Sequence, residues 1–532
     1  MTSHDQKDRP GVVTRSSVRR FNVDVALLRS LDIDVGTVDR TTLRRLLPLL
    51  CLGVVLVRAT YVLQPLRNDE GGYLLIARQW HTGGEFLYGD YFVDRPPLLV
   101  MIYRFAALTE WDGAIRVIAI PFALLFVLAA WHAGNILSGR SGGRWSAVVA
   151  AGLMCSPALA ADQADGELFA AALVMTSIAL ALSAWNALPS PRQLWLAGVA
   201  GVFAGSAPLV KQNVLEGLLF MTGLVVVASW ARRGTGPREV LVGTGAFVGA
   251  LFPYALVWLW ATMAGIDPAS IWRDLASFRG AAFEVIWSSS PEASITRAVL
   301  LLVLGLVSGA LAVVVTWLVA ARRRPQRSSP EHRAITGLVL FGIAAITAGG
   351  SYWPNYLLQL APAVVLAAGA VAPSASRTGR WMRASSRVIV GAAVLGSVVT
   401  SVVYATVPWV SFQQRTGEWL ADSKAAGDTA FVAYGNASVL EAADMQSPYP
   451  HLWSVPMRTL DPEQERLRAT LAGPEAPSWI VQVNGLNSWQ IDAGSRLRDL
   501  VDERYRVVAT ICGDPVWLRQ DLTRQLAPPP RC

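Results

Sequence analysis

Residues 64–99 read QPLRNDEGGYLLIARQWHTGGEFLYGDYFVDRPPLL and directly follow an apolar run at 46–63. Acidic side chains are concentrated in this stretch: Asp69, Glu70, Glu85, Asp90 and Asp94. Acids next to a membrane helix are costly unless they are solvated, paired or used in function. Two adjacent carboxylates at the mouth of a span are candidates for a general base that takes a proton from a hydroxyl. The alternative is a solvated loop in which Asp69 caps the helix that follows.

The chain around this stretch is largely apolar. Of its 532 residues, 53% are hydrophobic and 16% are charged, against about 25% charged in an ordinary soluble domain. This composition excludes a plain cytosolic enzyme and a secreted disulfide scaffold. Apolar runs long enough to cross a bilayer predict about 11 spans. The runs are 46–63, 113–137, 145–161, 168–187, 194–209, 213–230, 240–263, 295–320, 334–350, 356–372 and 388–407.

Basic residues fall in alternate gaps between these runs. The positive-inside rule places such gaps, together with the Arg-rich leader, in the cytoplasm. An odd number of spans then puts the C-terminal tail outside the plasma membrane. The net charge of +8 therefore reflects topology, and no basic face with interleaved aromatics indicates nucleic-acid binding. The basic residues of the alternate gaps are Arg140, Arg144, Arg192, Arg232, Arg233, Arg238, Arg322, Arg323, Arg324, Arg327, Arg333, Arg377, Arg380, Arg383 and Arg387.

We expect three parts along the chain. The tail has buried strand patterns at 429–434, 478–483 and 505–511, with helical patterns at 461–471 and 493–501 between them. This order predicts a small extracytoplasmic α/β domain with a β-α-β arrangement and a short sheet. The expected parts are a cytoplasmic basic leader (1–45), a transmembrane domain (46–407) whose first outer loop is 64–112, and the extracytoplasmic domain (408–532).

The four cysteines and five histidines predict no protein metal centre. The cysteines form no CxxC pair, and the histidines have no HExxH spacing. Cys512 and Cys532 both lie in the tail, on the predicted outer side, where a disulfide could form. Two free thiols are the alternative.

The stretch quoted above carries a family resemblance. The strings DEGGY at 69–73, YGD at 88–90 and DRPPL at 94–98 resemble the first outer loop of the GT-C membrane glycosyltransferases. More narrowly, they are similar to the dolichyl-phosphate-mannose and aminoarabinose transferase-like branch. The resemblance covers roughly 46–407 and implies a GT-C fold. It also implies that Asp69 is catalytic, with Glu70 as the second candidate, and that Arg95 contacts the phosphate of a lipid donor, where family members often have lysine.

Two further places carry the resemblance. The acidic segment DQADGE at 162–167 resembles a loop that faces the same cavity, although acids also favour a helix N-terminus. Lys211 lies between two apolar runs, where a cation is expensive, and family members carry a comparable lysine near the donor phosphate. The alternative is an interfacial lysine that snorkels to water.

A late stretch at 352–358 resembles a family segment that commonly reads His-Tyr. Here Asn355 stands in the histidine place before Tyr356, and an amide hydrogen-bonds without carrying charge. The segment 266–297, rich in aromatic and charged residues, is long enough for part of a substrate cleft or for an interfacial helix. The residues expected to line the substrate cavity are Tyr73, Asp94, Asp162, Asp165, Glu167, Gln212, Asn355 and Tyr356.

The resemblance implies an inverting hexosyl or pentosyl transferase, similar to mannosyltransferases. Its donor would be a polyprenyl-phosphate sugar in the bilayer, since no nucleotide-binding loop is present. The acceptor hydroxyl would belong to a glycan, a protein or a small molecule on the outer face of a bacterial plasma membrane, in cell-envelope glycan assembly or modification. No cofactor is certain, although Asp69 and Glu70 could hold a divalent cation.

The alternative is a transporter or flippase of a lipid-linked glycan. Such a protein would place ionisable residues near the midplane of two related halves. Convergence of Asp69, Arg95 and Lys211 on one cavity would favour transfer, and their dispersion would favour transport.

Overall fold

Helices dominate the chain because a segment in hydrocarbon must satisfy its own backbone hydrogen bonds. The computed structural model describes residues 40–289, 291–323 and 329–532, so most of the predicted leader 1–45 lies outside the described residues. The helices of the first half are α2 (Arg40–Val62), α3 (Asn68–Gln79), α4 (Pro97–Ala106), α5 (Ala114–Met154), α6 (Gly166–Asn186), α7 (Pro191–Ser206), α8 (Glu216–Arg232) and α9 (Pro237–Met263).

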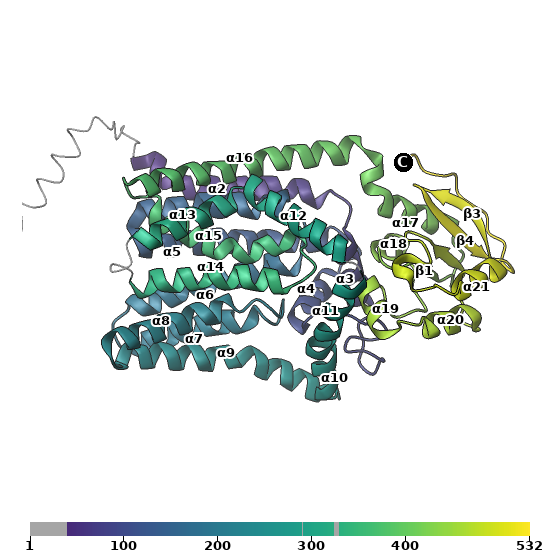
Figure 1. Ribbon diagram of the computed structural model, residues 1–532, viewed down its shortest axis with the longest axis horizontal. Coiled ribbons are helices and arrows are strands. Elements are labelled where there is room, and N and C mark those ends of the chain that lie inside the picture. Colours follow the sequence, from purple (N-terminus) through teal and green to yellow (C-terminus); the bar gives the residue numbers. More distant parts are fainter. Residues whose placement is uncertain (1–39, 290, 324–328) are drawn as a thin grey trace, which may run out of the picture. The chain divides into compact units, whose positions relative to one another are not determined.

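The second half continues with helices that lie alongside these (Figure 1). A π-helical turn, Arg273–Ser277, separates α10 from α11, and a 3-10 turn, Pro354–Leu360, leads into α15. The helices are α10 (Pro268–Trp272), α11 (Phe278–Ser289), α12 (Pro291–Val307), α13 (Ala310–Arg323), α14 (Pro330–Ala348), α15 (Ala361–Val371) and α16 (Arg377–Thr406).

The number of spans differs from the sequence prediction. Within the described residues, seven helices are long and apolar enough to cross a membrane, or eight if the bent α10–α12 region is one span. The predicted count of 11 is not confirmed. The runs 194–209 and 213–230 give helices of only 16 and 17 residues. The run 295–320 breaks between α12 and α13, where Gly309 takes a φ of +77°.

Helix α5 contains two of the predicted runs. Its 41 residues are interrupted at Ser138 and Gly139, which leave helical geometry, and Gly139 has a φ of +64°. The two halves fold back on each other, since a Cβ on Gly134 would lie 2.6 Å from the carbonyl oxygen of Gly142. Residues eight apart on a straight helix are about 12 Å apart, so this contact needs the break. The sequence runs 113–137 and 145–161 therefore form a helical hairpin.

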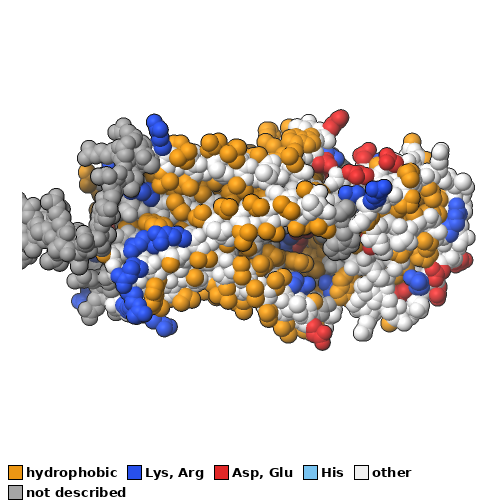
Figure 2. Space-filling view, turned by 90° about the horizontal axis from the view of Figure 1, so that it is seen from above, with side chains coloured by type: hydrophobic (Ala, Val, Ile, Leu, Met, Phe, Trp, Pro, Cys, Tyr) orange, Lys and Arg blue, Asp and Glu red, His pale blue; other side chains and the backbone are white. Residues whose placement is uncertain are grey.

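Side-chain character divides the surface of the helical part. Figure 2 shows hydrophobic side chains along the helices and a group of Lys and Arg side chains at one end. Arginines end α8 and α13 and begin α16, in gaps that the sequence assigned to one side. The chain is thus a membrane protein whose basic gaps share an end.

The C-terminal part carries a four-stranded sheet of order β1-β2-β4-β3. Strand β1 (Ala430–Val432) pairs parallel with β2 (Trp479–Val481), which confirms the predicted β-α-β order. Strand β4 (Asp514–Arg519), which the sequence did not suggest, pairs antiparallel with both β2 and β3 (Tyr505–Ile511). The accompanying helices are α17 (Phe412–Ser423), α18 (Ser438–Ala442), α19 (Ser454–Leu460), α20 (Glu465–Ala472) and α21 (Arg496–Arg504).

A disulfide and hydrogen bonds hold the end of the chain against this domain. Cys512 and Cys532 are joined by a disulfide, with their Cα atoms 5.2 Å apart. The indole of Trp419, on α17, donates to the carbonyl of Ala527 at 2.9 Å. The last six residues, 527–532, are therefore anchored at both of their ends.

Helix α3 is the element on which the C-terminal domain packs. Residues 49–532 form one compact unit, and two glycines allow the contact. A Cβ on Gly71 would lie 2.6 Å from the Cα of Ser438, and a Cβ on Gly72 would lie 2.4 Å from the indole of Trp453. The glycine pair at 71–72 is thus required by close approach rather than by a turn.

Substitution of Gly71 by alanine should weaken this packing. The new methyl group meets backbone rather than a movable side chain, so we expect a loss of about 1–3 kcal/mol. Gly391→Ala on α16, where a Cβ meets nothing within 4 Å, should leave stability unchanged or raise it through helix propensity. Melting of the detergent-purified chain, followed by intrinsic fluorescence, measures both. Equal melting temperatures for the two variants would contradict the packing argument.

Candidate functional site

A buried ion pair fixes the start of α3. The carboxylate of Glu70 is 0% exposed and the side chain of Arg116 is 1% exposed. Arg116 Nε donates to Oε1 at 2.8 Å and Nη2 to Oε2 at 2.6 Å. The backbone N–H groups of Arg67 and Ala164 each donate to the same carboxylate at 2.9 Å. Burial opposes ionisation, but Arg116 holds the pKa of Glu70 below its usual value.

This geometry changes the interpretation of the adjacent acids. Glu70 uses both of its oxygens in four hydrogen bonds and has no free face, so it is not placed to act as a base or to share a cation with Asp69. We therefore correct the second-candidate role predicted for Glu70 and treat it as structural. Within the described residues, no group of three or more His, Cys, Asp or Glu side chains is arranged to hold a metal ion.

Asp69 is half-buried, and its carboxylate makes its hydrogen bonds away from Arg116. Its Oδ2 accepts from the hydroxyl of Tyr73 at 3.3 Å, one helical turn later. Its Oδ1 accepts from the indole Nε1 of Trp453 at 2.9 Å. The preceding Asn68 accepts from the backbone N–H of Ala437 at 2.7 Å. Two residues of the C-terminal domain thus hold the beginning of α3 from the other side.

Arg95 joins Asp69 through Tyr73. Its Nε donates to the Tyr73 hydroxyl at 2.6 Å and its Nη1 to Asp94 at 2.6 Å. Asp94 also pairs with Arg279 at 2.7 Å. Burial opposes ionisation of Asp94, but Arg279 and then Arg95 hold its pKa below the usual value. Burial raises the pKa of Tyr73 well above its usual value, despite Arg95, so Tyr73 keeps the proton that it shares with Asp69.

Lys211 lies in a second part of the same cluster. Its Nζ pairs with Glu167 at 2.8 Å and lies 5.4 Å from the centre of the Tyr356 ring. Asn355 donates to both Asp165 and Glu167 at 3.1 Å. Burial, with the Glu167 carboxylate close by, raises the pKa of Asp165 well above its usual value. The pair of acids therefore carries less negative charge beside Lys211 than two free carboxylates would.

Backbone contacts connect the two parts. The side-chain amide of Gln212 donates to the backbone carbonyl of Asp94, and the backbone N–H of Leu98 donates to the carbonyl of Leu209 at 3.0 Å. The structure thus brings together Asp69, Tyr73, Asp94, Arg95, Asp165, Glu167, Lys211, Gln212, Asn355 and Tyr356. These residues come from the segments that follow α2, precede α6, separate α7 from α8 and precede α15.

Asp162 does not join this cluster. It is 3% exposed and faces Arg67 at 3.7 Å. Burial raises its pKa, and the nearest cations that oppose this are Arg67 and Arg116. Asp162 therefore belongs with the Glu70–Arg116 pair, and its predicted place in the substrate cavity is corrected.

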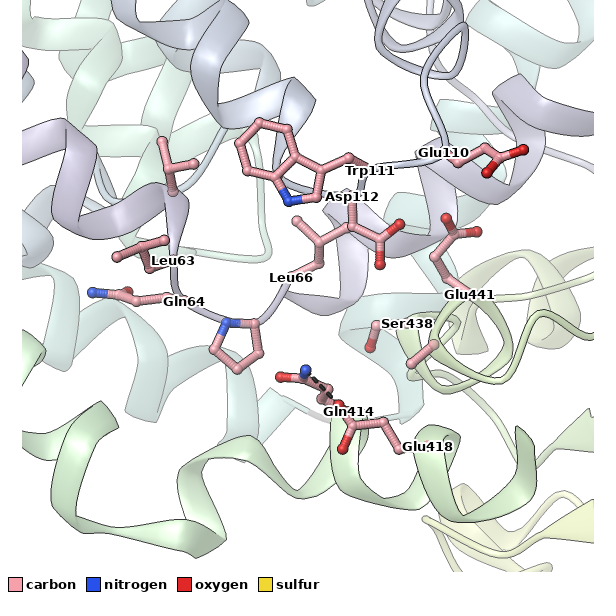
Figure 3. Close-up of a pocket in the computed structure, with 14 residues that line it drawn as sticks. Leu63, Gln64, Leu66, Glu110, Trp111, Asp112, Gln414, Glu418, Ser438 and Glu441 are labelled. Carbon is pink, nitrogen blue, oxygen red and sulfur yellow. Dashed lines mark hydrogen bonds between the residues drawn. The ribbon is translucent and has the colours of Figure 1, made fainter. Parts of the chain in front are cut away.

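A cavity of about 400 Å³ lies on the other side of the start of α3 (Figure 3). The carboxylates of Glu110, Asp112 and Glu441 border it. Arg78 pairs with Asp112 at 2.8 Å and with Glu441 at 2.5 Å. Its lining contains neither Asp69 nor the cations near it. This cavity is an acidic seam of the interface with the C-terminal domain, separate from the cluster that contains Asp69.

Three contacts of this region were not foreseen from the sequence. Arg116 lies inside a predicted apolar run, and a charge there needs a partner, so a signal for it existed. Arg279 lies in the segment 266–297, which the sequence offered as part of a cleft, but its pairing with Asp94, 185 residues away, had no local signal. Trp453 gave no signal either, because it meets Asp69 across 384 residues.

Comparison with solved structures places this arrangement in a known fold. The crystal structure of ArnT from Cupriavidus metallidurans bound to undecaprenyl phosphate aligns at a TM-score of 0.60 and 16% identity, covering 90% of this chain and 98% of that one. The apo form aligns at 0.57 and 15%, covering 88% and 97%. No protein-family model and no curated protein matches the sequence. At this identity the likeness shows the fold alone.

The fold class predicted from the sequence is thereby confirmed. The chain has the GT-C fold, a polytopic helical membrane part followed by a small α/β domain. The resemblance carried by residues 69–98 implied the same fold.

Replacing Glu70 and Asp69 separately should show that only Glu70 is needed for stability. Glu70→Ala leaves Arg116 buried without its counter-charge, and such losses cost about 3–5 kcal/mol. Asp69→Asn keeps the shape of a half-buried side chain and should melt within a few degrees of the parent chain. Thermal unfolding of both purified variants is the measurement. A Glu70→Ala variant as stable as Asp69→Asn would remove the structural assignment.

Proposed function

We propose that the chain is a membrane glycosyltransferase that moves a monosaccharide from a polyprenyl-phosphate donor to an acceptor hydroxyl. The observation that carries this proposal is the convergence of Asp69, Arg95 and Lys211 in one cluster at the ends of the helices. A base and two cations are the groups that such a displacement needs at its two ends. The ArnT structure that shares the fold contains undecaprenyl phosphate, which supports a donor of this class.

The proposed reaction is a single inverting displacement. Asp69 takes the proton of the acceptor hydroxyl as its oxygen bonds to the anomeric carbon. The bond from that carbon to the phosphate oxygen breaks, and the electron pair leaves with the polyprenyl phosphate. Arg95 and Lys211 stabilise the charge that develops on this phosphate, and interactions that strengthen in the transition state raise the rate.

The cations are held ready for an anion. Arg95 uses Nε and Nη1 in its bonds to Tyr73 and Asp94, and within the described part of the chain its Nη2 makes no hydrogen bond. A guanidinium with one free edge can add a phosphate oxygen without losing its fixed position. Lys211 is 8% exposed and reaches the cluster from the segment between α7 and α8.

We propose further that the cluster and the C-terminal domain face the outside of the plasma membrane and act in cell-envelope glycan assembly or modification. The basic gaps at the opposite end of the helices support this topology. Charges that gather at helix ends fit transfer to a substrate outside the bilayer, whereas a flippase would need them near the midplane.

Loss of the base should abolish transfer. In membranes supplied with a panel of radiolabelled polyprenyl-phosphate sugars, Asp69→Asn should lower the rate with the active donor by about 10²–10⁴-fold. The label that moves identifies the sugar. Asp112→Asn, a half-exposed acid outside the cluster, is the control and should keep full activity. Transfer that persists in Asp69→Asn would sink the proposed role.

Trp453 should act as a positioning residue. Trp453→Phe keeps an aromatic ring against Tyr73, whose centre lies 5.5 Å away, but removes the bond to Asp69. We expect kcat to fall about three- to tenfold, the effect of one hydrogen bond, while KM for the donor stays constant. A rise in KM at constant kcat would show instead that the indole binds substrate.

A further inference from the structure

A second cavity, of about 510 Å³, lies where the 85–92 segment, the α10–α11 turn and the C-terminal domain meet. One wall is aromatic. The ring of Phe92 lies 4.8 Å from that of Phe278 and 5.6 Å from that of Phe86, measured between ring centres. The imidazole of His451 lies 6.0 Å from both Phe86 and Phe92. These rings give the cavity a flat, apolar side.

Polar atoms on the same cavity lack partners. His451 is 6% exposed and Asp274 is 2% exposed. Within the described residues, His451 Nδ1 and Asp274 Oδ2 are buried and make no hydrogen bond. Leaving such atoms unpaired costs free energy, and a bound molecule with hydroxyl groups would satisfy them. Burial lowers the pKa of His451 to about 4, so at neutral pH the ring offers one donor and one acceptor.

The charges around the cavity cancel in pairs. Arg466 meets Glu85 through two bonds, of which Nη2 to Oε2 is 2.6 Å. Arg273 Nε donates to Asp274 Oδ1 at 2.9 Å. Arg466 differs from Arg95, because both of its Nη groups are bonded to Glu85 and neither is left for a phosphate oxygen. The balance therefore favours a neutral ligand.

The cavity adjoins the cluster that contains Asp69. The N–H of Phe92 donates to the carbonyl of Pro450 at 3.1 Å. Two residues beyond His451 in the chain, Trp453 donates to Asp69. On the other wall, Phe278 precedes Arg279, which pairs with Asp94. The same two segments thus line the cavity and hold the acids of the cluster.

We infer that this cavity is the acceptor subsite and that it binds a neutral sugar ring. The phenyl rings would lie against the C–H face of the sugar, and His451 and Asp274 would bind its hydroxyl groups. That the ligand is the acceptor rests on the proposed function. The acceptor class is then a neutral glycan, and its subsite lies on the Arg279 side of Asp94.

Saturation-transfer NMR on the full-length chain in lipid nanodiscs tests this inference without a donor. The probes are the methyl α-glycosides of mannose, glucose and galactose, with mannose 1-phosphate as the charged comparison. We expect at least one neutral glycoside to bind through its ring C–H protons and to bind more tightly than mannose 1-phosphate. His451→Phe, which keeps a ring in the aromatic wall, should weaken that binding about fivefold or more.

Two variants control the experiment. Thr459→Val alters a cavity residue whose hydroxyl already donates to the Val455 carbonyl, so glycoside binding should not change. Asp274→Asn repeats the test on the other unpaired atom, should His451→Phe fail to fold. Three results would each overturn the inference: no binding by any neutral glycoside, equal binding by the parent, His451→Phe and Asp274→Asn, or tighter binding of mannose 1-phosphate.

The Asp69→Asn variant separates this inference from the proposed function. It should bind the glycoside as the parent does while losing transfer. Asp69-dependent transfer without glycoside binding would overturn the cavity assignment and keep the transferase. Glycoside binding without transfer from any donor would overturn the acceptor role, because the cavity would then serve a protein that moves no sugar.

Discussion

The buried pair between Glu70 and Arg116 is the contact on which the rest of the site depends. Arg116 also donates to the carbonyls of Tyr61, Gln64 and Pro65, which belong to the last turn of α2 and to the segment that leads to α3. A single guanidinium therefore fixes the exit of one helix and the entry of the next. Glu70 in turn accepts from Ala164, which ties the turn to the segment before α6. Asp69 gains its direction because its neighbour Glu70 is held by four hydrogen bonds from three residues.

Paired charges also explain how so many ionisable groups can share a small volume. Each cation of the cluster is matched to an acid, Arg95 to Asp94 and Lys211 to Glu167. Removing charge from water is expensive unless the partner lies at hydrogen-bonding distance. The paired acids therefore lower the cost of burying these cations within the protein.

Sequence reasoning reached the fold and much of the cluster because these depend on local signals. Apolar runs, the DEGGY and DRPPL strings and a lysine between two apolar runs can each be seen without a partner. Sequence reasoning did not predict features that depend on contacts between distant residues. Glu70 and Asp69 are neighbours with similar side chains, and only Arg116, 46 residues away, separates their roles. The span count is not confirmed for a similar reason, since an apolar run does not show that Gly309 will break it. The roles proposed for Asp69, Arg95 and Lys211 stay predictions.

The indole of Trp453 is separated from Asp69 by 384 positions in the chain. During synthesis, all helices from α2 to α16 leave the ribosome before this residue does. A chain that ends after α16 would contain all of these helices, but its Asp69 would lack the hydrogen bond from Trp453 and keep only the one from Tyr73. The geometry of Asp69 is therefore completed late, when the last quarter of the polypeptide has folded onto α3. Folding of the final domain therefore adds the last hydrogen bond to Asp69.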